Sequence, residues 1–184
     1  DTNMCGIVGL HLRNPDLHPR LGELLAQMLG EMQDRGADSA GIAIYGNADW
    51  APPGHGCVSL LEVAATPADV VATLGTALGV TVAARAVDET LVLSAPVDSE
   101  ELLAAARGAY PDALVAGFGA DLTVLKGVGA PRDLTESWGL AAASGWQGVG
   151  HTRMATESAV TPSGAHPFAV GPEPGSYTHL RAHE

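Results

Sequence analysis

Apolar runs separated by polar turns divide the start of the chain into a strand, a helix and a second strand. Gly6–Leu12 is a short and nearly continuous apolar run, which is typical of a buried strand. The turn Asn14-Pro15-Asp16 can cap a helix, and Gly36 is predicted to end that helix in the left-handed conformation. Residues Gly41–Tyr45 are predicted to form the second strand. The apolar stripe of the helix consists of Leu21, Leu24, Leu25, Met28 and Met32.

The pattern changes between Trp50 and Gly56, where Pro52-Pro53-Gly54 indicates a boundary. Six elements are predicted beyond it, in the order strand, helix, strand, strand, helix, strand. They cover Cys57–Val63, Pro67–Leu78, Val80–Val87, Leu91–Ser94, Ser99–Arg107 and Leu114–Phe118. This β-α-β-β-α-β order is typical of a ferredoxin-like unit, so we interpret residues 55–120 as an inserted subdomain. The alternative is that these elements extend the main sheets.

Two strands and a helix are predicted after the insertion. Leu122–Val128 is a strand that returns to the main body, Arg132–Ala143 is a helix, and Gln147–Thr152 is a strand that leads into Arg153. Residues 171–184 lack apolar alternation and begin with a stretch rich in Pro and Gly. We expect this segment to be a disordered extension, or the sign of a truncated domain.

Composition limits the classes of partner. Hydrophobic residues make up 46% of the 184 residues and aromatic residues only 4%, so the core is expected to consist of Ala, Val, Leu and Ile. Nine Lys and Arg against 21 Asp and Glu give a net charge of −12, which argues against nucleic acid as a partner. The longest apolar-rich run, Val70–Ala84, is shorter than the about 18 residues that a membrane span needs. No secretory signal or disulfide framework is visible, and we expect a cytoplasmic protein with no membrane association.

Cys5 is the first candidate for chemistry. A lone cysteine in an apolar strand is usually a buried, inert thiol. If residues 1–4 are removed, however, Cys5 carries both a thiol and a free α-amine. The α-amine titrates near pH ~7.7–8.0 and can act as the base for a thiol whose ordinary pKa is about 8.5. Nucleophile and base would then be tethered in one residue, which lowers the entropic cost of bringing them together.

Three strings in the sequence carry a resemblance to a known family. They are MCGIVG at residues 4–9, RGADSAG at residues 35–41, and GHTRMAT at residues 150–156 followed by AHP at residues 165–167. In this order they resemble the class II glutamine amidotransferases. Over about residues 4–170 the chain is similar to the glutaminase domain of glutamate synthase and to the corresponding subunit of N-methylglutamate synthase.

The resemblance implies a fold and a reaction. The fold is an α+β, four-layer αββα N-terminal-nucleophile hydrolase sandwich made of residues 4–54 and 121–170, incomplete here, with residues 55–120 inserted. The reaction is hydrolysis of L-glutamine to glutamate and ammonia through a thioester on Cys5. The ammonia would pass to a partner synthase subunit that performs the acceptor chemistry. No cofactor is implied, and the histidines lack the spacing of metal ligands.

The resemblance also implies roles for residues around Cys5. Arg153 would hold the α-carboxylate of glutamine, since a guanidinium offers a planar pair of donors, and Thr156 would contact the substrate backbone. The alternative for Arg153 is a surface cation at a strand end. Support of the site is expected from Arg35, Gly36, Asp38, Ser39, His151 and His166. Residues 35–39 are equally compatible with a simple helix-to-strand turn, and the two histidines are expected to be structural rather than proton carriers.

One feature of the family is missing from the sequence. In the family an Asn-Gly pair forms the oxyanion hole, but no Asn follows Asn47. Loss of one such donor costs about 10²–10³ in rate. A weakly active or inactive fragment is therefore one alternative, and a non-catalytic regulatory or interaction module of the same family is another. A third is a hydrolase that acts on a different amide, although Arg153 favours an amino-acid substrate.

Overall fold

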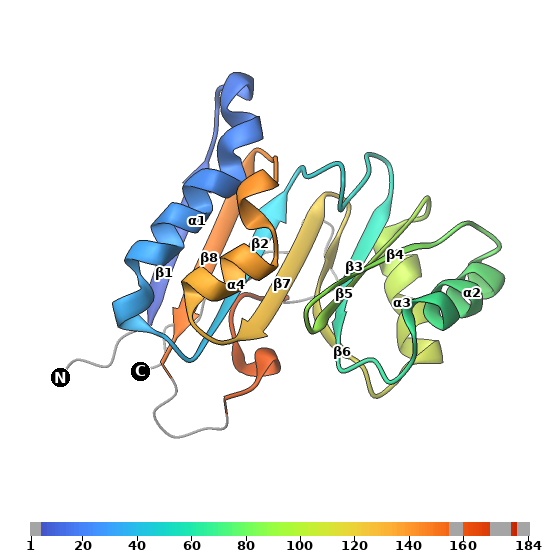
Figure 1. Cartoon of the computed structure of the whole chain (residues 1–184). Coiled ribbons are helices and arrows are strands. Elements are labelled where there is room, and N and C mark those ends of the chain that lie inside the picture. Colours follow the sequence, from blue (N-terminus) through green and yellow to red (C-terminus); the bar gives the residue numbers. More distant parts are fainter. Residues whose placement is uncertain (1–4, 155–159, 170–177, 180–184) are drawn as a thin grey trace.

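In the computed structural model, which describes residues 5–154, 160–169 and 178–179, the chain forms an α+β structure with two four-stranded antiparallel sheets. The first sheet has the order β1-β8-β2-β7 and the second the order β4-β5-β3-β6. Helices α1 and α4 cover one face of the first sheet, and α2 and α3 cover one face of the second (Figure 1). The strands of the first sheet are β1 (Gly6–His11), β2 (Ser39–Tyr45), β7 (Leu122–Val128) and β8 (Gln147–Arg153).

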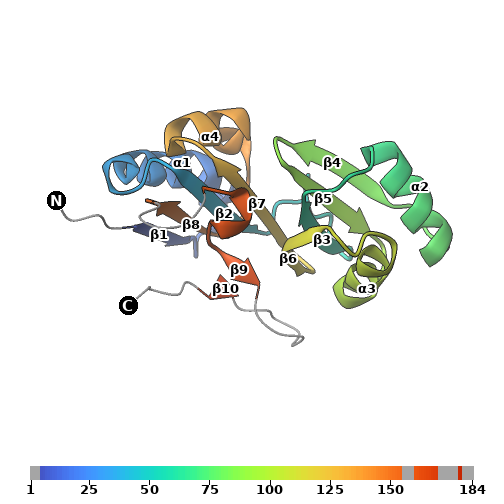
Figure 2. The same ribbon diagram turned by 90° about the horizontal axis from the view of Figure 1, so that it is seen from below.

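The strands of the second sheet are β3 (Gly56–Leu61), β4 (Ala83–Val87), β5 (Thr90–Ala95) and β6 (Leu114–Gly119). The α-helices are α1 (Leu21–Glu31), α2 (Pro67–Leu78), α3 (Ser99–Ala109) and α4 (Pro131–Ser137). Short 3-10 turns are η1 (Pro15–Arg20), η2 (Gln33–Arg35), η3 (Leu140–Ala142) and η4 (Pro162–Gly164). Strands β9 (Phe168–Ala169) and β10 (Thr178–His179) pair with each other on the side of the first sheet opposite α1 and α4 (Figure 2).

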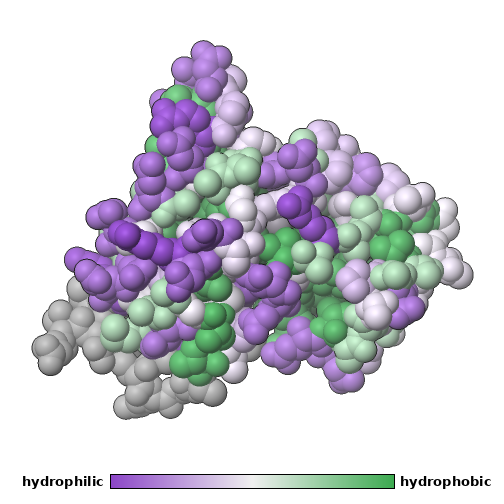
Figure 3. Space-filling model, in the orientation of Figure 1, coloured by the Kyte–Doolittle hydropathy of each residue, from purple (hydrophilic) through white to green (hydrophobic). Residues whose placement is uncertain are grey.

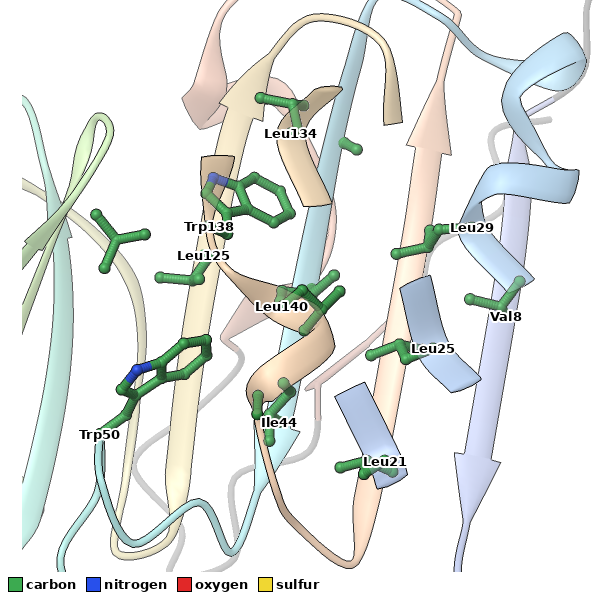
Figure 4. Close-up of a cluster of buried hydrophobic side chains, with 14 of the residues drawn as sticks. Val8, Leu21, Leu25, Leu29, Ile44, Trp50, Leu125, Leu134, Trp138 and Leu140 are labelled. Carbon is green, nitrogen blue, oxygen red and sulfur yellow. The ribbon is translucent and has the colours of Figure 1, made fainter. Parts of the chain in front are cut away.

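The first sheet with α1 and α4 is called the first unit, and the second sheet with α2 and α3 the second unit. The core of the first unit lies between its sheet and its two helices. Leu21, Leu25 and Leu29 of α1 are fully buried against the sheet (Figure 4). Leu25 and Leu29 can lie close to β8 because Gly148 and Gly150 have no side chain. A Cβ at Gly148 would overlap Leu25, and one at Gly150 would overlap Leu29. Burial of each leucine stabilises the fold by roughly 1.5–3 kcal/mol. The other large members of this core include Val8, Ile44, Trp50, Leu125, Leu134, Trp138 and Leu140.

The second unit meets the first along the edge strand β7. Its helices pack on one face of its sheet over Val58, Leu60 and Leu93. The opposite face lies against β7, where the Ser59 hydroxyl accepts a hydrogen bond from the Val124 N–H at 3.1 Å. The Thr90 hydroxyl accepts one from the Lys126 N–H and donates one to the Lys126 carbonyl, both at 3.3 Å. Edge groups of β7 that would otherwise need water are thereby satisfied within the chain.

The predicted elements occur along the chain, with differences in some of their bounds. Gly36 is not left-handed but extended, at φ −177°, and α1 ends earlier, at Glu31. The helix predicted over Arg132–Ala143 is divided into α4 and η3 because Gly139 takes a positive φ of 64°. Near the predicted boundary, Trp50 is buried in the first core and its ring lies 5.4 Å from the Arg85 guanidinium.

The elements of the second unit follow one another in the predicted order strand, helix, strand, strand, helix, strand, and its four strands form one sheet. The interpretation of this unit as a ferredoxin-like insertion stays a prediction. The same holds for the division of the chain at residues 54 and 121. Of the predicted disordered segment 171–184, only Thr178 and His179 lie within the described residues, as β10.

The surface is largely hydrophilic over α1, whereas hydrophobic side chains gather near the junction of the two units and over part of the second (Figure 3). Among the described residues, exposed large hydrophobic side chains occur at Ile7, Leu17, Leu114, Val128 and Val160. Within the same residues, none of the helices combines the length and the apolar character needed to cross a membrane.

Candidate functional site

Three of the sequence strings meet at one end of the first sheet. Strand β1 runs antiparallel to β8, with Gly6 opposite Thr152, so Cys5 precedes β1 where β8 reaches Arg153. Strand β2 runs antiparallel to β8 on its other side, with Ser39 opposite Arg153. The start of β1, the end of β8 and the start of β2 are therefore neighbours, although the end of β8 lies more than a hundred residues along the chain from the other two.

Cys5 is accessible at this end of the sheet. It is an exposed, free cysteine, in contrast to Cys57, which is buried. The structure thus does not seal the predicted nucleophile inside the core. The reverse holds for Cys57, since burial raises the pKa of its thiol to about 12 and the nearby Asp121 carboxylate adds to the rise. A thiol that stays protonated is a poor nucleophile, so Cys57 is unsuited to this chemistry.

The residue after Cys5 is fixed by a side chain from β8. The Gly6 N–H donates a hydrogen bond to the Thr152 hydroxyl at 3.1 Å, and that hydroxyl donates in turn to the Met32 carbonyl at 3.4 Å. A Cβ on Gly6 would lie only 2.7 Å from the Thr152 hydroxyl oxygen and 2.9 Å from the Met32 Cβ. Glycine is therefore the residue that permits this close contact between β1, β8 and the end of α1.

Alternation of side chains determines which face of the sheet carries the site. Thr152 points toward Met32, on the side of α1, so its neighbours His151 and Arg153 point to the opposite side. Ser39 is paired with Arg153 and shares that side. Its hydroxyl is fully buried and has no hydrogen-bond partner within the part of the chain that the structure describes. Extending the same alternation to Cys5 places its side chain on this face as well.

The backbone of Arg153 is held by the turn that leads into β2. The Asp38 N–H donates a hydrogen bond to the Arg153 carbonyl at 3.1 Å, and the Asp38 carbonyl accepts one from the Gly129 N–H at 2.9 Å. A Cβ on Gly36 would lie 2.7 Å from the carbonyl carbon of Arg153. Gly36 therefore has a steric function, since it lets the turn lie directly on β8.

The side chain of Arg153 is held from the other direction. Its guanidinium lies against Gly164, the last residue of η4, where a Cβ would overlap Nη1 and lie 3.2 Å from Cζ. Backbone and side chain of Arg153 are thus enclosed by two separate segments, residues 36–38 and η4. Arg153 as a whole is partly buried, and its Nη1 atom beside Gly164 is fully buried.

The two histidines of the sequence strings form a buried pair beneath this region. His151 is 3% exposed and His166 4%, and their ring centroids are 4.5 Å apart at an interplanar angle of 54°. A Cβ on Gly41 would overlap the His166 carbonyl oxygen, so the segment that carries His166 crosses directly over β2. The two rings pack the segment that carries His166 onto the sheet, on the face to which Arg153 points.

The structure brings Cys5, Gly36, Asp38, Ser39, His151, Arg153 and His166 to one end of the sheet. Arg35 lies in η2 with an exposed side chain. Thr156 lies outside the described residues. In the part of the chain that the structure describes, there is no group of three or more His, Cys, Asp or Glu side chains arranged to hold a metal ion. The functional roles of all these residues stay predictions.

Three residues of this region were not singled out by the sequence. Thr152 lay inside a string but offered no sign of its bond to Gly6, and Gly164 offered none of its contact with Arg153. Lys126 did carry a signal, since it is the only lysine of the sequence and alternates with Leu122 and Val124 in an apolar strand. It is 2% exposed, in register with Gly41, and burial lowers its pKa to about 8.

Comparison with known proteins finds two relatives and no matching family model. The chain is 42% identical over 175 residues to "Glutamine amidotransferase-like protein GlxB" of Rhizobium meliloti, covering 91% of this chain and 56% of the relative. It is 28% identical over 189 residues to "Putative glutamine amidotransferase" of Methanothermobacter thermautotrophicus, covering 90% and 56%. The chain thus spans about half the length of the curated relatives it matches. Both relatives carry the term glutamine amidotransferase in their names.

Proposed function

We propose, from the family that these relatives support, that the chain is the glutaminase part of a class II glutamine amidotransferase, with Cys5 as its nucleophile. The observation that carries the proposal is the position of Cys5 and Arg153 at the ends of two paired strands, with the cysteine exposed. A nucleophile beside a guanidinium fits an amide substrate that also carries a carboxylate. L-Glutamine has both groups.

The proposed reaction uses Cys5 twice. Its α-amine accepts the thiol proton, and the sulfur attacks the side-chain carboxamide carbon of glutamine. The C–N bond then breaks, the leaving nitrogen takes the proton from the amine, and ammonia departs. Water finally cleaves the thioester to release glutamate and the free thiol. This sequence requires Cys5 to be the first residue of the mature protein, because an amide nitrogen following Met4 has no basicity.

Arg153 is proposed to bind the α-carboxylate. A guanidinium donates two parallel hydrogen bonds to a carboxylate, and its orientation decides how well both are made. The contacts of Arg153 with Asp38, Gly36 and Gly164 support this role, because they fix both the backbone and the side chain. Arg35, Ser39, His151 and His166 are proposed to support the site, and Thr156 to contact the substrate.

The fold and the partner form the outer part of the proposal. We propose that the first unit is an N-terminal-nucleophile hydrolase domain and that residues 55–120 are a ferredoxin-like insertion. The first unit has an antiparallel sheet with α1 and α4 on one face and the pair β9 and β10 on the other, which is compatible with an incomplete sandwich of this kind. Ammonia is proposed to pass to a synthase subunit, since glutamine hydrolysis alone supplies nitrogen without an acceptor.

The test uses a glutamine analogue in which a diazoketone replaces the carboxamide. Incubation of protein from which residues 1–4 have been removed with this analogue is expected to add one adduct on Cys5, located by mass spectrometry of tryptic peptides. Cys5→Ala is expected to abolish the adduct, and Arg153→Lys to raise the concentration needed for half-maximal labelling by roughly tenfold or more, because the ammonium cannot make the two-pronged contact.

N-terminal sequencing of the same sample tests the amine. Glutaminase activity in a chain that retains Asp1 would refute the terminal-amine mechanism. Absence of any adduct on an accessible Cys5 would favour the alternative function, a non-catalytic regulatory or interaction module.

A further inference from the structure

We propose that Gly164 is a positioning residue for Arg153, and that the missing side chain at position 164 sets the orientation of the guanidinium. The inference rests on the proposed function, in which Arg153 binds the substrate carboxylate. In this inference, η4 (Pro162–Gly164) forms the surface against which the Arg153 guanidinium packs. Nothing in the three sequence strings points to Gly164.

The contact between Gly164 and Arg153 is the first support. Of the three heavy atoms nearest to a Cβ built on Gly164, two are Nη1 and Cζ of the Arg153 guanidinium. The Nη1 atom would be overlapped, and Cζ would lie at 3.2 Å, closer than nearly all real Cβ contacts. The third atom, the Thr161 hydroxyl oxygen, lies at 3.4 Å, which is an ordinary contact. Space at position 164 is thus occupied mainly by the end of the arginine.

The backbone of Gly164 gives no other reason for glycine. Its φ lies outside the positive range that disfavours other residues, unlike that of Gly139. Its N–H donates to the Thr161 carbonyl at 3.1 Å and to the Thr161 hydroxyl at 3.3 Å. An alanine keeps this N–H and both acceptors. A Gly164→Ala change therefore acts through the added methyl group and the guanidinium beside it.

The consequence follows from the flexibility of arginine. The added methyl moves the far end of the Arg153 side chain rather than any backbone, so the fold tolerates it. The planar fork of the guanidinium is displaced, however, and one of its two bonds to a carboxylate is weakened or lost. A displacement of this kind weakens binding and leaves the attack of the thiol unaltered, because Cys5 precedes β1 and is not in contact with η4 through position 164.

The experiment measures labelling of the protein that begins at Cys5 by the diazoketone analogue of glutamine at several concentrations. Gly164→Ala is expected to raise the concentration for half-maximal rate roughly tenfold and to leave the rate at saturation unchanged. The matched control is Gly108→Ala, since a Cβ on Gly108 meets nothing within 4 Å and that glycine lies in α3, away from the site. This control is expected to label like the unmodified chain.

A double variant separates an effect through Arg153 from a general disturbance of η4. In an Arg153→Lys background there is no Nη1 atom to displace, so adding Gly164→Ala is expected to cause no further change. Additive effects of the two substitutions would overturn the inference, as would normal labelling of Gly164→Ala in a protein whose Arg153→Lys variant is impaired. Failure of the unmodified chain to label, or an Arg153→Lys variant that labels normally, would instead contradict the proposed function.

Discussion

The backbone N–H of Gly6 and the hydroxyl of Thr152 form a hydrogen bond of 3.1 Å between residues 146 positions apart in the sequence. The Thr152 hydroxyl also reaches the Met32 carbonyl at 3.4 Å. The Thr152 side chain therefore connects the residue that follows Cys5 and the end of α1 to β8, the strand that ends at Arg153. The geometry of the candidate site depends on this bond before any substrate arrives.

Removing the Thr152 hydroxyl is the first test. Thr152→Val keeps the shape of the side chain but leaves the buried Gly6 N–H without its acceptor, which costs about 1–3 kcal/mol in the free energy of unfolding. Thr152→Ser, which retains the hydroxyl, is the matched control and is expected to lose less. Urea unfolding measures both. A Thr152→Val protein as stable as the unmodified chain would show that the bond contributes nothing.

The two cysteines are expected to react very differently with a thiol reagent. Cys5 is exposed, whereas Cys57 is buried and burial raises the pKa of its thiol to about 12. At pH 8 the folded chain is therefore expected to react at one thiol with 5,5′-dithiobis(2-nitrobenzoate), and at both in guanidinium chloride. The native signal is expected to disappear in Cys5→Ala and to persist in Cys57→Ala. Two fast thiols in the folded chain would contradict the burial of Cys57.

The buried lysine predicts a dependence of stability on pH. Burial lowers the pKa of Lys126 from 10.5 to about 8, so between these values the unfolded chain holds a proton that the folded chain lacks. The contribution of this group to stability therefore increases as pH rises from about 8 to 10.5, and is lost as pH falls through 8. Lys126→Met removes the group, so the stability difference between variant and unmodified chain is expected to change by roughly 3 kcal/mol across this window.

Guanidinium unfolding at pH 7.5, 9 and 10 measures this difference. Because Cys57 titrates over an overlapping range with the opposite sign, the comparison is made between two proteins that both retain Cys57. Arg107→Met, at an exposed position, is the control for the loss of a cation. A stability difference that stays constant over these pH values would contradict a lowered pKa for Lys126.

Gly41 offers a test of the segment that covers β2. A methyl group at this position would overlap the His166 carbonyl oxygen, so Gly41→Ala is expected to cost about 1–3 kcal/mol by overpacking. Gly9→Ala in β1 is the control, since a Cβ there meets nothing within 4 Å. Thermal unfolding compares the two. Equal effects of both substitutions would show that the segment at His166 does not lie on Gly41.

Much of the fold was accessible from local patterns. The strand over Leu122–Val128 was predicted with the bounds that the structure shows, because its apolar run is flanked by Gly and Asp residues. Helix α1 was predicted from its stripe, but the fully buried Leu29 was missed and the partly buried Met28 and Met32 were included. Periodicity indicates a face of a helix, whereas the position of the facing sheet decides which residues on that face are buried.

The residues of the candidate site could be predicted mainly from the three sequence strings. The contacts that bring these residues together could not be predicted. The sequence indicated Cys5 and Arg153 but not that Gly6 opposes Thr152, since strand pairing over such a separation leaves no local signal. The left-handed conformation expected at Gly36 is absent, and the segment that approaches this glycine, the backbone of Arg153, could not be identified from the sequence. Steric requirements imposed by a distant segment have no counterpart in local spacing.

The hydroxyl groups of Ser59 and Thr90, which bind the outer edge of β7, also limit where a further strand can add to the first sheet. They occupy backbone positions to which an incoming chain would have to bind, so this edge is closed to strand addition from another molecule. Any enlargement of this sheet, whether by a further segment or by misassembly at high concentration, is directed to the β1 side, next to the cysteine.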